Sequence, residues 1–133
     1  MNLDDSASQG TSDTSGPAAS RRQMVGKTIY ISGPMTGLPG NNAAAFFAAA
    51  YSLSAAGHRP VNPVEVAAHL PPDASWHAFM RADIKALCDC DALALLPGWE
   101  RSAGAQLELH IAHRLGLEIG VVDRFCRARN EID

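Results

Sequence analysis

Short apolar runs alternate with longer amphipathic stretches along the chain from residue 27 onward. Short runs rich in β-branched and apolar residues are typical of strands, whereas apolar positions that recur every three to four residues indicate helices. The predicted strands are residues 27–32, 92–96 and 118–123, with a short extended segment at 59–63. The predicted helices are residues 43–56, 76–90 and 104–116, with a small helical turn at 64–69.

This alternation of strands and helices predicts the fold class. Strands that alternate with helices form parallel sheets with helices packed on both faces. The run at 92–96 is apolar throughout, as expected for a strand that is covered on both faces. We therefore predict an α/β fold, a Rossmann-like three-layer sandwich with a mostly parallel sheet of four to five strands.

Residues that begin and end helices stand next to the predicted helices. The asparagines at 41–42 precede the first helix, Asp73 or Ser75 precedes the second, and Ser102 precedes the third. Asn, Asp and Ser side chains accept hydrogen bonds from the free N–H groups of a first helical turn, so these residues are candidate N-caps. Gly116 is expected to close the third helix, because glycine readily adopts the left-handed conformation found there.

Composition changes at both ends of the chain. Residues 1–24 are rich in Ser, Asp, Gly, Thr and Ala and contain almost nothing apolar, which is typical of a disordered N-terminal tail. Residues 25–124 contain every predicted strand and helix and are expected to form one domain. Residues 125–133 are charged and are interpreted as a C-terminal tail.

Composition and charge exclude several classes of protein. The 133 residues are 47% hydrophobic and 19% charged, with a net charge of -3, which disfavours nucleic acid or an acidic membrane as a partner. No apolar run approaches the roughly 20 residues that span a bilayer, and the N-terminus lacks the apolar core of a secretory signal. The chain has only three cysteines, which suits a protein in a reducing compartment, so we expect a cytoplasmic location.

Glu108 interrupts the apolar face of the helix predicted at 104–116. When these residues are placed at about 100° per residue, Glu108 falls among Leu109, Ile111 and Ala112 rather than on the polar face. Burying a carboxylate is costly unless it is paired or used. Taken alone, such a glutamate is more often a structural residue satisfied by neighbouring donors.

Asp83 shows the same anomaly on the helix predicted at 76–90, where it falls between Phe79, Met80 and Leu87. Each of these two helices follows a strand of the predicted sheet. In α/β folds, ligands bind at the carboxyl ends of the strands. The glycine-rich loop 33–40 follows the first strand and permits close approach of a ligand, although its spacing fits neither the dinucleotide nor the P-loop motif. Two inward carboxylates beside this loop predict a binding crevice.

The predicted crevice also has a helix start that suits an anion. Ser102 begins the helix that carries Glu108, and the first N–H groups of a helix attract negative charge. Two carboxylates near an anion site suit the cleavage of a glycosidic bond, in which one carboxylate attacks or stabilises the anomeric carbon and the other assists the leaving group. A sugar phosphate or a nucleotide is the expected kind of ligand.

Three motifs resemble the nucleoside 2-deoxyribosyltransferase-like superfamily, over about residues 27–122. The chain is most similar to a little-characterised, often phage-associated branch that shares the Gly-Pro-Met-Thr-Gly loop and the Leu-Pro-Gly-Trp turn. The motifs are Tyr-Ile-Ser-Gly at 30–33, Asp-Ile at 83–84 followed by Cys-Asp-Ala-Leu at 90–93, and Ser-Ala-Gly-Ala-Gln-Leu-Glu-Leu at 102–109.

The resemblance implies catalytic roles for three residues. Glu108 matches the nucleophile that forms a covalent glycosyl-enzyme intermediate, and Tyr30 matches a tyrosine that orients it. Asp83 matches the aspartate that contacts the nucleobase and protonates it as it leaves. The resemblance also implies a homodimer or larger assembly, because a neighbouring subunit often completes the pocket in this superfamily.

The resemblance further implies the residues that bind the substrate. Ser102 matches the position that contacts the 5′ end of the sugar, which is serine in relatives that hydrolyse deoxynucleoside monophosphates and aspartate in those that use nucleosides. Pro34 and Thr36 stand where the monophosphate hydrolases carry Ser and Arg, so the phosphate loses an expected partner. The expected substrate-binding residues are Ser32, Gly33, Pro34, Met35, Gly37, Trp99, Ser102 and Gly104.

Other polar and aromatic residues are open to more than one interpretation. His110 and His113 lie three residues apart and could bind a metal, but nothing acidic or thiol completes a ligand set, so we expect no metal and no cofactor. Trp99 either stacks on a base or covers its own loop. Glu100 and Arg101 are interpreted as exposed loop charges.

Two function classes remain open at this point. The first is an enzyme that cleaves or transfers at the N-glycosidic bond of a nucleoside or its 5′-monophosphate. The second is a nucleotide-binding module on the same fold that senses or sequesters its ligand. The presence of all three catalytic matches favours the enzyme, and the missing arginine in the first loop favours the binding module.

Overall fold

The computed structural model describes residues 26–132, and its centre is a sheet of four parallel strands. The strands are β1 (Thr28–Ser32), β2 (Arg59–Val61), β3 (Ala92–Leu95) and β4 (Glu118–Val121). Their order across the sheet is β2-β1-β3-β4, so β1 and β3 are neighbours although a long segment separates them in the sequence. The predicted α/β fold is confirmed, with four strands that are all parallel.

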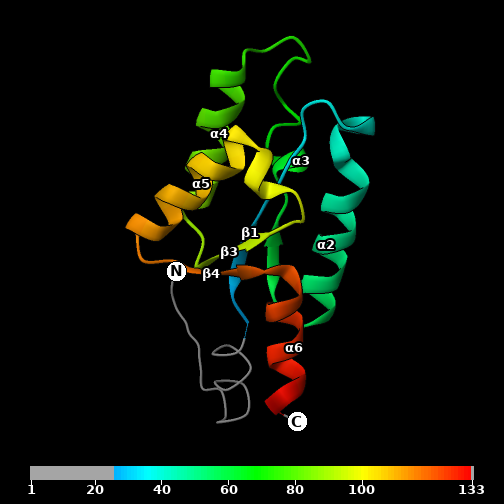
Figure 1. Ribbon diagram of the computed structural model, residues 1–133, viewed down its shortest axis with the longest axis vertical. Coiled ribbons are helices and arrows are strands. Elements are labelled where there is room, and N and C mark those ends of the chain that lie inside the picture. Colours follow the sequence, from blue (N-terminus) through cyan, green and yellow to red (C-terminus); the bar gives the residue numbers. More distant parts are fainter. Residues whose placement is uncertain (1–25, 133) are drawn as a thin grey trace, which may run out of the picture.

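Helices cover both faces of the sheet (Figure 1). One face is covered by α2 (Ala43–Ala55) and α6 (Val122–Ile132), and the other by α4 (Trp76–Cys88) and α5 (Ala103–Arg114). Three shorter elements lie in the connections: η3 (Pro39–Asn42), α3 (Pro63–Val66) and η4 (Trp99–Arg101). The result is the predicted three-layer sandwich.

Side chains of β1 alternate between the two layers, as they must in a strand. Ile29 and Ile31 are fully buried in the core formed with α2 and α6. Tyr30 is fully buried on the opposite face, in the core formed with α4 and α5. Ser32 shares the face of Tyr30, so the carboxyl end of β1 directs two hydroxyl groups toward α4 and α5.

Two of the predicted helix caps are present. The Oγ atom of Ser75 accepts a hydrogen bond from the N–H of Ala78 at 3.1 Å, and the Oγ atom of Ser102 accepts one from the N–H of Ala105 at 3.1 Å. Asn42 occupies the N-cap position of α2, but its side chain does not form the predicted capping hydrogen bond. It adopts a left-handed conformation, and its Nδ2 atom donates to the carbonyl of Pro34 at 2.9 Å.

The chain after β4 differs from its predicted C-terminal tail. Residues 122–132 form α6, and Phe125 is only 3% exposed in the core beside α2. The residues around Phe125 include many charged side chains, so the sequence did not indicate a helix here. The helix needs few apolar residues, because it covers only one side of a small sheet. The predicted N-terminal tail, residues 1–24, lies outside the described residues.

The sheet order creates a crevice beside the carboxyl ends of β1 and β3. The chain leaves β1 toward α2 and leaves β3 toward α5, on opposite faces of the sheet, so the two connections diverge there. Such a divergence is where ligands bind in open α/β sheets. Among the described helices, none has the length and apolar composition needed to cross a membrane.

Candidate functional site

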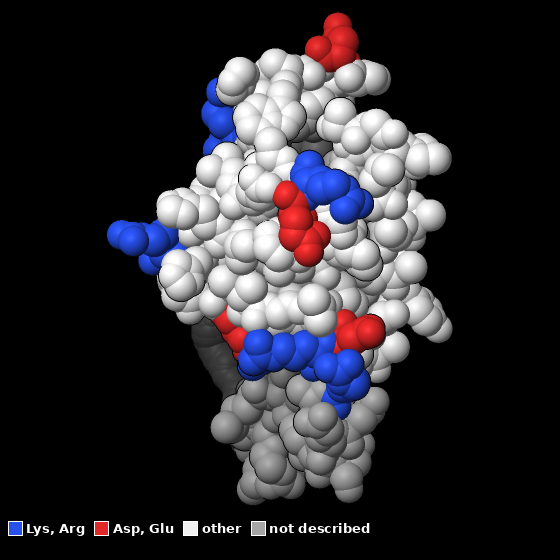
Figure 2. Space-filling model, in the orientation of Figure 1, with Lys and Arg blue, Asp and Glu red and all other residues white. Residues whose placement is uncertain are grey.

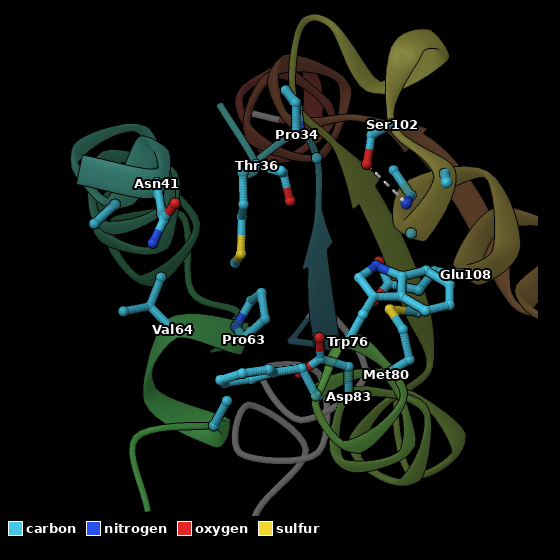
Figure 3. Close-up of a pocket in the computed structure, with 18 of the residues that line it drawn as sticks. Pro34, Thr36, Asn41, Pro63, Val64, Trp76, Met80, Asp83, Ser102 and Glu108 are labelled. Carbon is cyan, nitrogen blue, oxygen red and sulfur yellow. Dashed lines mark hydrogen bonds between the residues drawn. The ribbon is translucent and has the colours of Figure 1, made fainter. Parts of the chain in front are cut away.

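A cavity of about 660 Å³ opens at this divergence. Its walls come from the loop after β1, from α3, and from the first turns of α4 and α5 (Figure 3). Asp83 and Glu108 lie on the side formed by α4 and α5, opposite Pro63 and Val64. A volume of this size lies within the range of small-molecule sites.

Glu108 is held at the cavity by two hydroxyl groups of β1. Its side chain leaves the second turn of α5 and is only 5% exposed. The hydroxyl of Tyr30 donates to Glu108 Oε2 at 2.8 Å, and the hydroxyl of Ser32 donates to Oε1 at 2.7 Å. Each carboxyl oxygen therefore has a buried donor, which fixes the orientation of the group.

Burial governs the acid–base state of Glu108. It raises the pKa from 4.5 to about 7, the hydrogen bonds from Ser32 and Tyr30 oppose the rise, and the nearby Asp83 adds to it. Burial beside the two carboxyls also raises the pKa of the Tyr30 phenol far above its ordinary value. Tyr30 therefore stays protonated and remains a donor to Glu108 at any physiological pH.

Asp83 is the second buried carboxyl of the cavity. It is 8% exposed, and burial raises its pKa from 3.8 to about 6. Its Oδ1 atom is buried and has no hydrogen-bond partner among the described residues. A buried polar atom without a partner is unfavourable. Asp83 also lines the cavity, so its carboxyl group lies where a bound ligand would contact it.

The two carboxyls titrate as a neighbouring pair. Their pKa values of about 6 and about 7 leave roughly one proton on the pair between these pH values. Hydrogen bonds from Tyr30 and Ser32 stabilise the ionised form of Glu108, whereas Asp83 has no comparable donor. The site can therefore present one carboxylate and one carboxylic acid near neutral pH.

Small residues let the backbone approach closely around the cavity. A Cβ atom at Gly33 would lie 2.7 Å from Leu96 Cβ, so only glycine lets the end of β1 pack against the end of β3. A Cβ atom at Gly104 would lie 3.2 Å from the sulfur of Met80, where α5 packs on α4. Both glycines line the cavity, as do the predicted substrate-binding residues Pro34, Met35 and Ser102.

Four other predicted site residues do not line the cavity among the described residues. Tyr30 and Ser32 are fully buried beneath it and contact Glu108 instead. Gly37 lies in the loop beyond the cavity wall. Trp99 is partly buried and packs against the core cluster that contains Tyr30.

The structure adds residues that the sequence analysis did not assign to the site. They are Thr36, Asn41, Pro63, Val64, Trp76, Phe79, Met80 and Arg101. Pro63 and Val64 follow β2, and Trp76 begins α4, so their position after strands or at a helix start was a signal that could have found them. Arg101 was interpreted as an exposed loop charge; it is exposed, but it also lines the cavity.

Potential metal ligands are not clustered in residues 26–132, since no group of three or more His, Cys, Asp or Glu side chains lies together there. His110 and His113 lie on α5 and are not among the residues that line the cavity. The polar side chains at or beneath the cavity include two carboxyls, four hydroxyls, one amide and one guanidinium group, which belong to Asp83, Glu108, Tyr30, Ser32, Thr36, Ser102, Asn41 and Arg101.

Comparison with known proteins places the chain in a family but not in an activity. No curated protein matches it significantly. The family model described as "Domain of unknown function (DUF4406)" matches residues 27–121, which include Tyr30, Asp83 and Glu108. The match covers the sheet and the whole candidate site, and the chain belongs to this family.

Proposed function

We propose that the protein cleaves or transfers at the N-glycosidic bond of a nucleoside, or of its 5′-monophosphate, through a covalent intermediate on Glu108. The observation that carries this proposal is the environment of Glu108: a buried carboxyl at the cavity, oriented by Tyr30 and Ser32. A purely structural glutamate would not need a second buried carboxyl that lines the same cavity, as Asp83 does.

The proposed reaction uses the two carboxyls in different protonation states. The ionised carboxylate of Glu108 attacks the anomeric carbon, and the bond from that carbon to the base nitrogen breaks, its electron pair going to the base. Protonated Asp83 gives its proton to the leaving base. Water or an acceptor base then attacks the anomeric carbon and gives a proton to the ionised Asp83, while the bond from that carbon to Glu108 breaks and its electron pair returns to the carboxylate. Attack by water makes the protein a hydrolase, and attack by a base makes it a transferase.

The roles of Tyr30 and Ser32 follow from their hydrogen bonds. Both hydroxyls donate to Glu108, which lowers its pKa against the effect of burial and keeps more of it ionised. Asp83 lacks such donors, and burial favours its neutral form. The pKa of Glu108, about 7, nevertheless lies above that of Asp83, about 6, so the last proton of the pair lies on Glu108 in the free chain, and the reaction requires this proton to pass to Asp83 when the substrate binds.

The resemblance to nucleoside 2-deoxyribosyltransferase-like proteins supports the same assignment. The three residues that match catalytic positions of that superfamily lie on β1, α4 and α5, far apart in the sequence, and the fold brings them to one site. Two of them, Tyr30 and Glu108, are hydrogen-bonded to each other.

A panel assay tests the proposal. The full chain is incubated with deoxyribo- and ribonucleosides and their 5′-monophosphates, with and without a second free base, and chromatography follows the release or exchange of base. Glu108→Gln should abolish turnover while retaining ligand binding, because glutamine keeps the size and much of the hydrogen bonding of the side chain. The matched control is Glu100→Gln, which changes an exposed glutamate of η4.

The outcomes separate the two function classes. Base release that is lost in Glu108→Gln supports the enzyme, and turnover by Glu108→Gln at nearly the wild-type rate would mean that the nucleophile is another residue. Tight binding of nucleotides without any base release or exchange would contradict the enzyme and identify a nucleotide-binding module.

A further inference from the structure

One basic side chain lines the cavity together with its two carboxyls. Of the described residues that line it, only Asp83, Glu108 and Arg101 are charged. The two carboxyls are at least nine-tenths buried, whereas Arg101 is exposed. Within residues 26–132, Arg101 forms an ion pair with neither carboxyl.

The loop before α5 places the Arg101 guanidinium group at the cavity wall. The N–H of Arg101 donates to the carbonyl of Gly98 at 3.1 Å, which closes the turn of η4. A Cβ atom at Gly98 would lie 3.3 Å from Arg101 Nη2 and 3.2 Å from Pro34 Cγ, so the guanidinium lies over this glycine beside Pro34. Within residues 26–132, the guanidinium group forms neither a hydrogen bond nor an ion pair.

The first turn of α5 lies next to Arg101. Ser102 accepts hydrogen bonds from Ala105 through Oγ and from Gln106 through its carbonyl oxygen. The N–H groups of Ala103 and Gly104 also belong to the first turn, which has no earlier carbonyls within the helix to receive them. Both residues line the cavity, where the positive end of the helix dipole adds to the charge of Arg101.

We infer that Arg101 and the first turn of α5 bind the phosphate group of a phosphorylated substrate, and that Arg101 thereby selects 5′-monophosphates over nucleosides. This inference rests on the proposed function. Arginine suits phosphate because its planar guanidinium donates two parallel hydrogen bonds. The arginine that the first loop lacks is thus replaced by one from a different element, η4, which approaches the cavity across Pro34.

The geometry of α5 agrees with a substrate that spans the cavity. Ser102 and Glu108 are six positions apart, which corresponds to about 9 Å along a helix axis. Ser102 and Asp83 lie at opposite ends of the view in Figure 3, with Glu108 on the wall between them. A phosphate at Ser102, a sugar at Glu108 and a base at Asp83 would follow this order. Asp83 lines the cavity at the far end and offers a carboxyl group to the base.

Calorimetric titration tests the inference without depending on turnover. The full chain carrying Glu108→Gln, which keeps the ligand intact, is titrated with dAMP, deoxyadenosine, dCMP, deoxycytidine and inorganic phosphate. Arg101→Gln is added to this background, and Arg101→Lys tests the need for the two-pronged donor. Arg114→Gln is the matched control, because Arg114 is an exposed arginine at the other end of the same helix.

We expect the monophosphates to bind more tightly than the matching nucleosides, and Arg101→Gln to weaken monophosphate binding about ten- to a hundredfold. The same change should alter nucleoside binding by less than about threefold, with an intermediate effect for Arg101→Lys and none for Arg114→Gln. Equal binding of monophosphates and nucleosides, equal weakening of both by Arg101→Gln, or binding of neither would overturn the inference.

Turnover by the wild-type chain distinguishes this inference from the proposed function. If base is released equally well from nucleosides and monophosphates, the enzyme stands and the phosphate site is refuted. If monophosphates bind through Arg101 but no base is released or exchanged, the phosphate site stands and the enzymatic proposal is refuted.

Discussion

Replacing Glu108 with glutamine should make the protein more stable at alkaline pH. Burial raises the pKa of Glu108 from 4.5 to about 7 in the folded chain, because its ionised form is poorly solvated there. Its contribution to folding is therefore fully present below pH 4.5 and is lost progressively as the pH rises to about 7. Glutamine has a similar shape and no charge, so it removes this pH-dependent cost.

The magnitude follows from the shift in pKa. A rise from 4.5 to about 7 corresponds to roughly 3 kcal/mol of folding free energy above pH 7. Part of that cost, about 1 kcal/mol, is already present at pH 5, where the unfolded carboxyl is largely ionised. The stability of Glu108→Gln relative to the wild type should therefore increase by about 2 to 3 kcal/mol between pH 5 and pH 8.

Urea denaturation of both chains, followed by circular dichroism at half-unit steps from pH 5 to pH 8, measures this change. The wild type and the variant share every other titrating group, so the contributions of all groups that are not coupled to Glu108, as Asp83 is, cancel in the difference. Glu100→Gln serves as the control, since an exposed carboxylate should change stability by no more than about 0.5 kcal/mol at any pH. A difference between Glu108→Gln and the wild type that stays constant with pH would refute the argument that burial raises this pKa.

Three further predictions concern the hydrogen bonds, the acid and the packing of the site. Tyr30→Phe removes one hydrogen-bond donor to Glu108 and should raise its pKa further, by about one to two. The value of kcat/KM should therefore fall about tenfold or more below pH 6, and this loss should become smaller as the pH rises. A pH-rate profile checks this, and a uniform loss at every pH would indicate a merely structural tyrosine. Asp83→Asn should slow substrates with poor leaving groups most, and initial rates across a series of bases would contradict proton donation if all slowed equally. Gly33→Ala should lower the free energy of unfolding by about 1–3 kcal/mol, because the added methyl group would contact Leu96. A thermal melt unchanged from that of the wild type would show that the two strand ends can separate without cost.

Local patterns were sufficient to predict the architecture. The alternation of apolar runs with amphipathic stretches predicted a parallel α/β sandwich, and the four parallel strands confirm it. Ser75 and Ser102 were identifiable as caps because the N–H groups from which they accept hydrogen bonds lie only three residues away. The helix at the C-terminus was missed, because Phe125 is one of few apolar residues there and its burial depends on contact with α2.

The sequence by itself also determined that Asp83 and Glu108 are anomalous, since each interrupts the apolar face of its own helix and helical periodicity is a local property. Only the tertiary structure decided what these residues contact. The hydroxyls of Tyr30 and Ser32 reach Glu108 across separations of 78 and 76 residues, because the sheet order places β1 beside β3. No local pattern encodes that neighbourhood.

The same reason explains the residues whose places were not predicted. Trp99 and Arg101 are two positions apart in η4, and the sequence alone offered an aromatic residue for the pocket and a charge for the solvent. Trp99 packs against the core and is not among the described residues that line the cavity, whereas Arg101 is exposed as predicted and also lines the cavity, beside Gly98 and Pro34. Composition and spacing determine which groups a chain carries, but the meeting of separate elements determines which of them face a ligand.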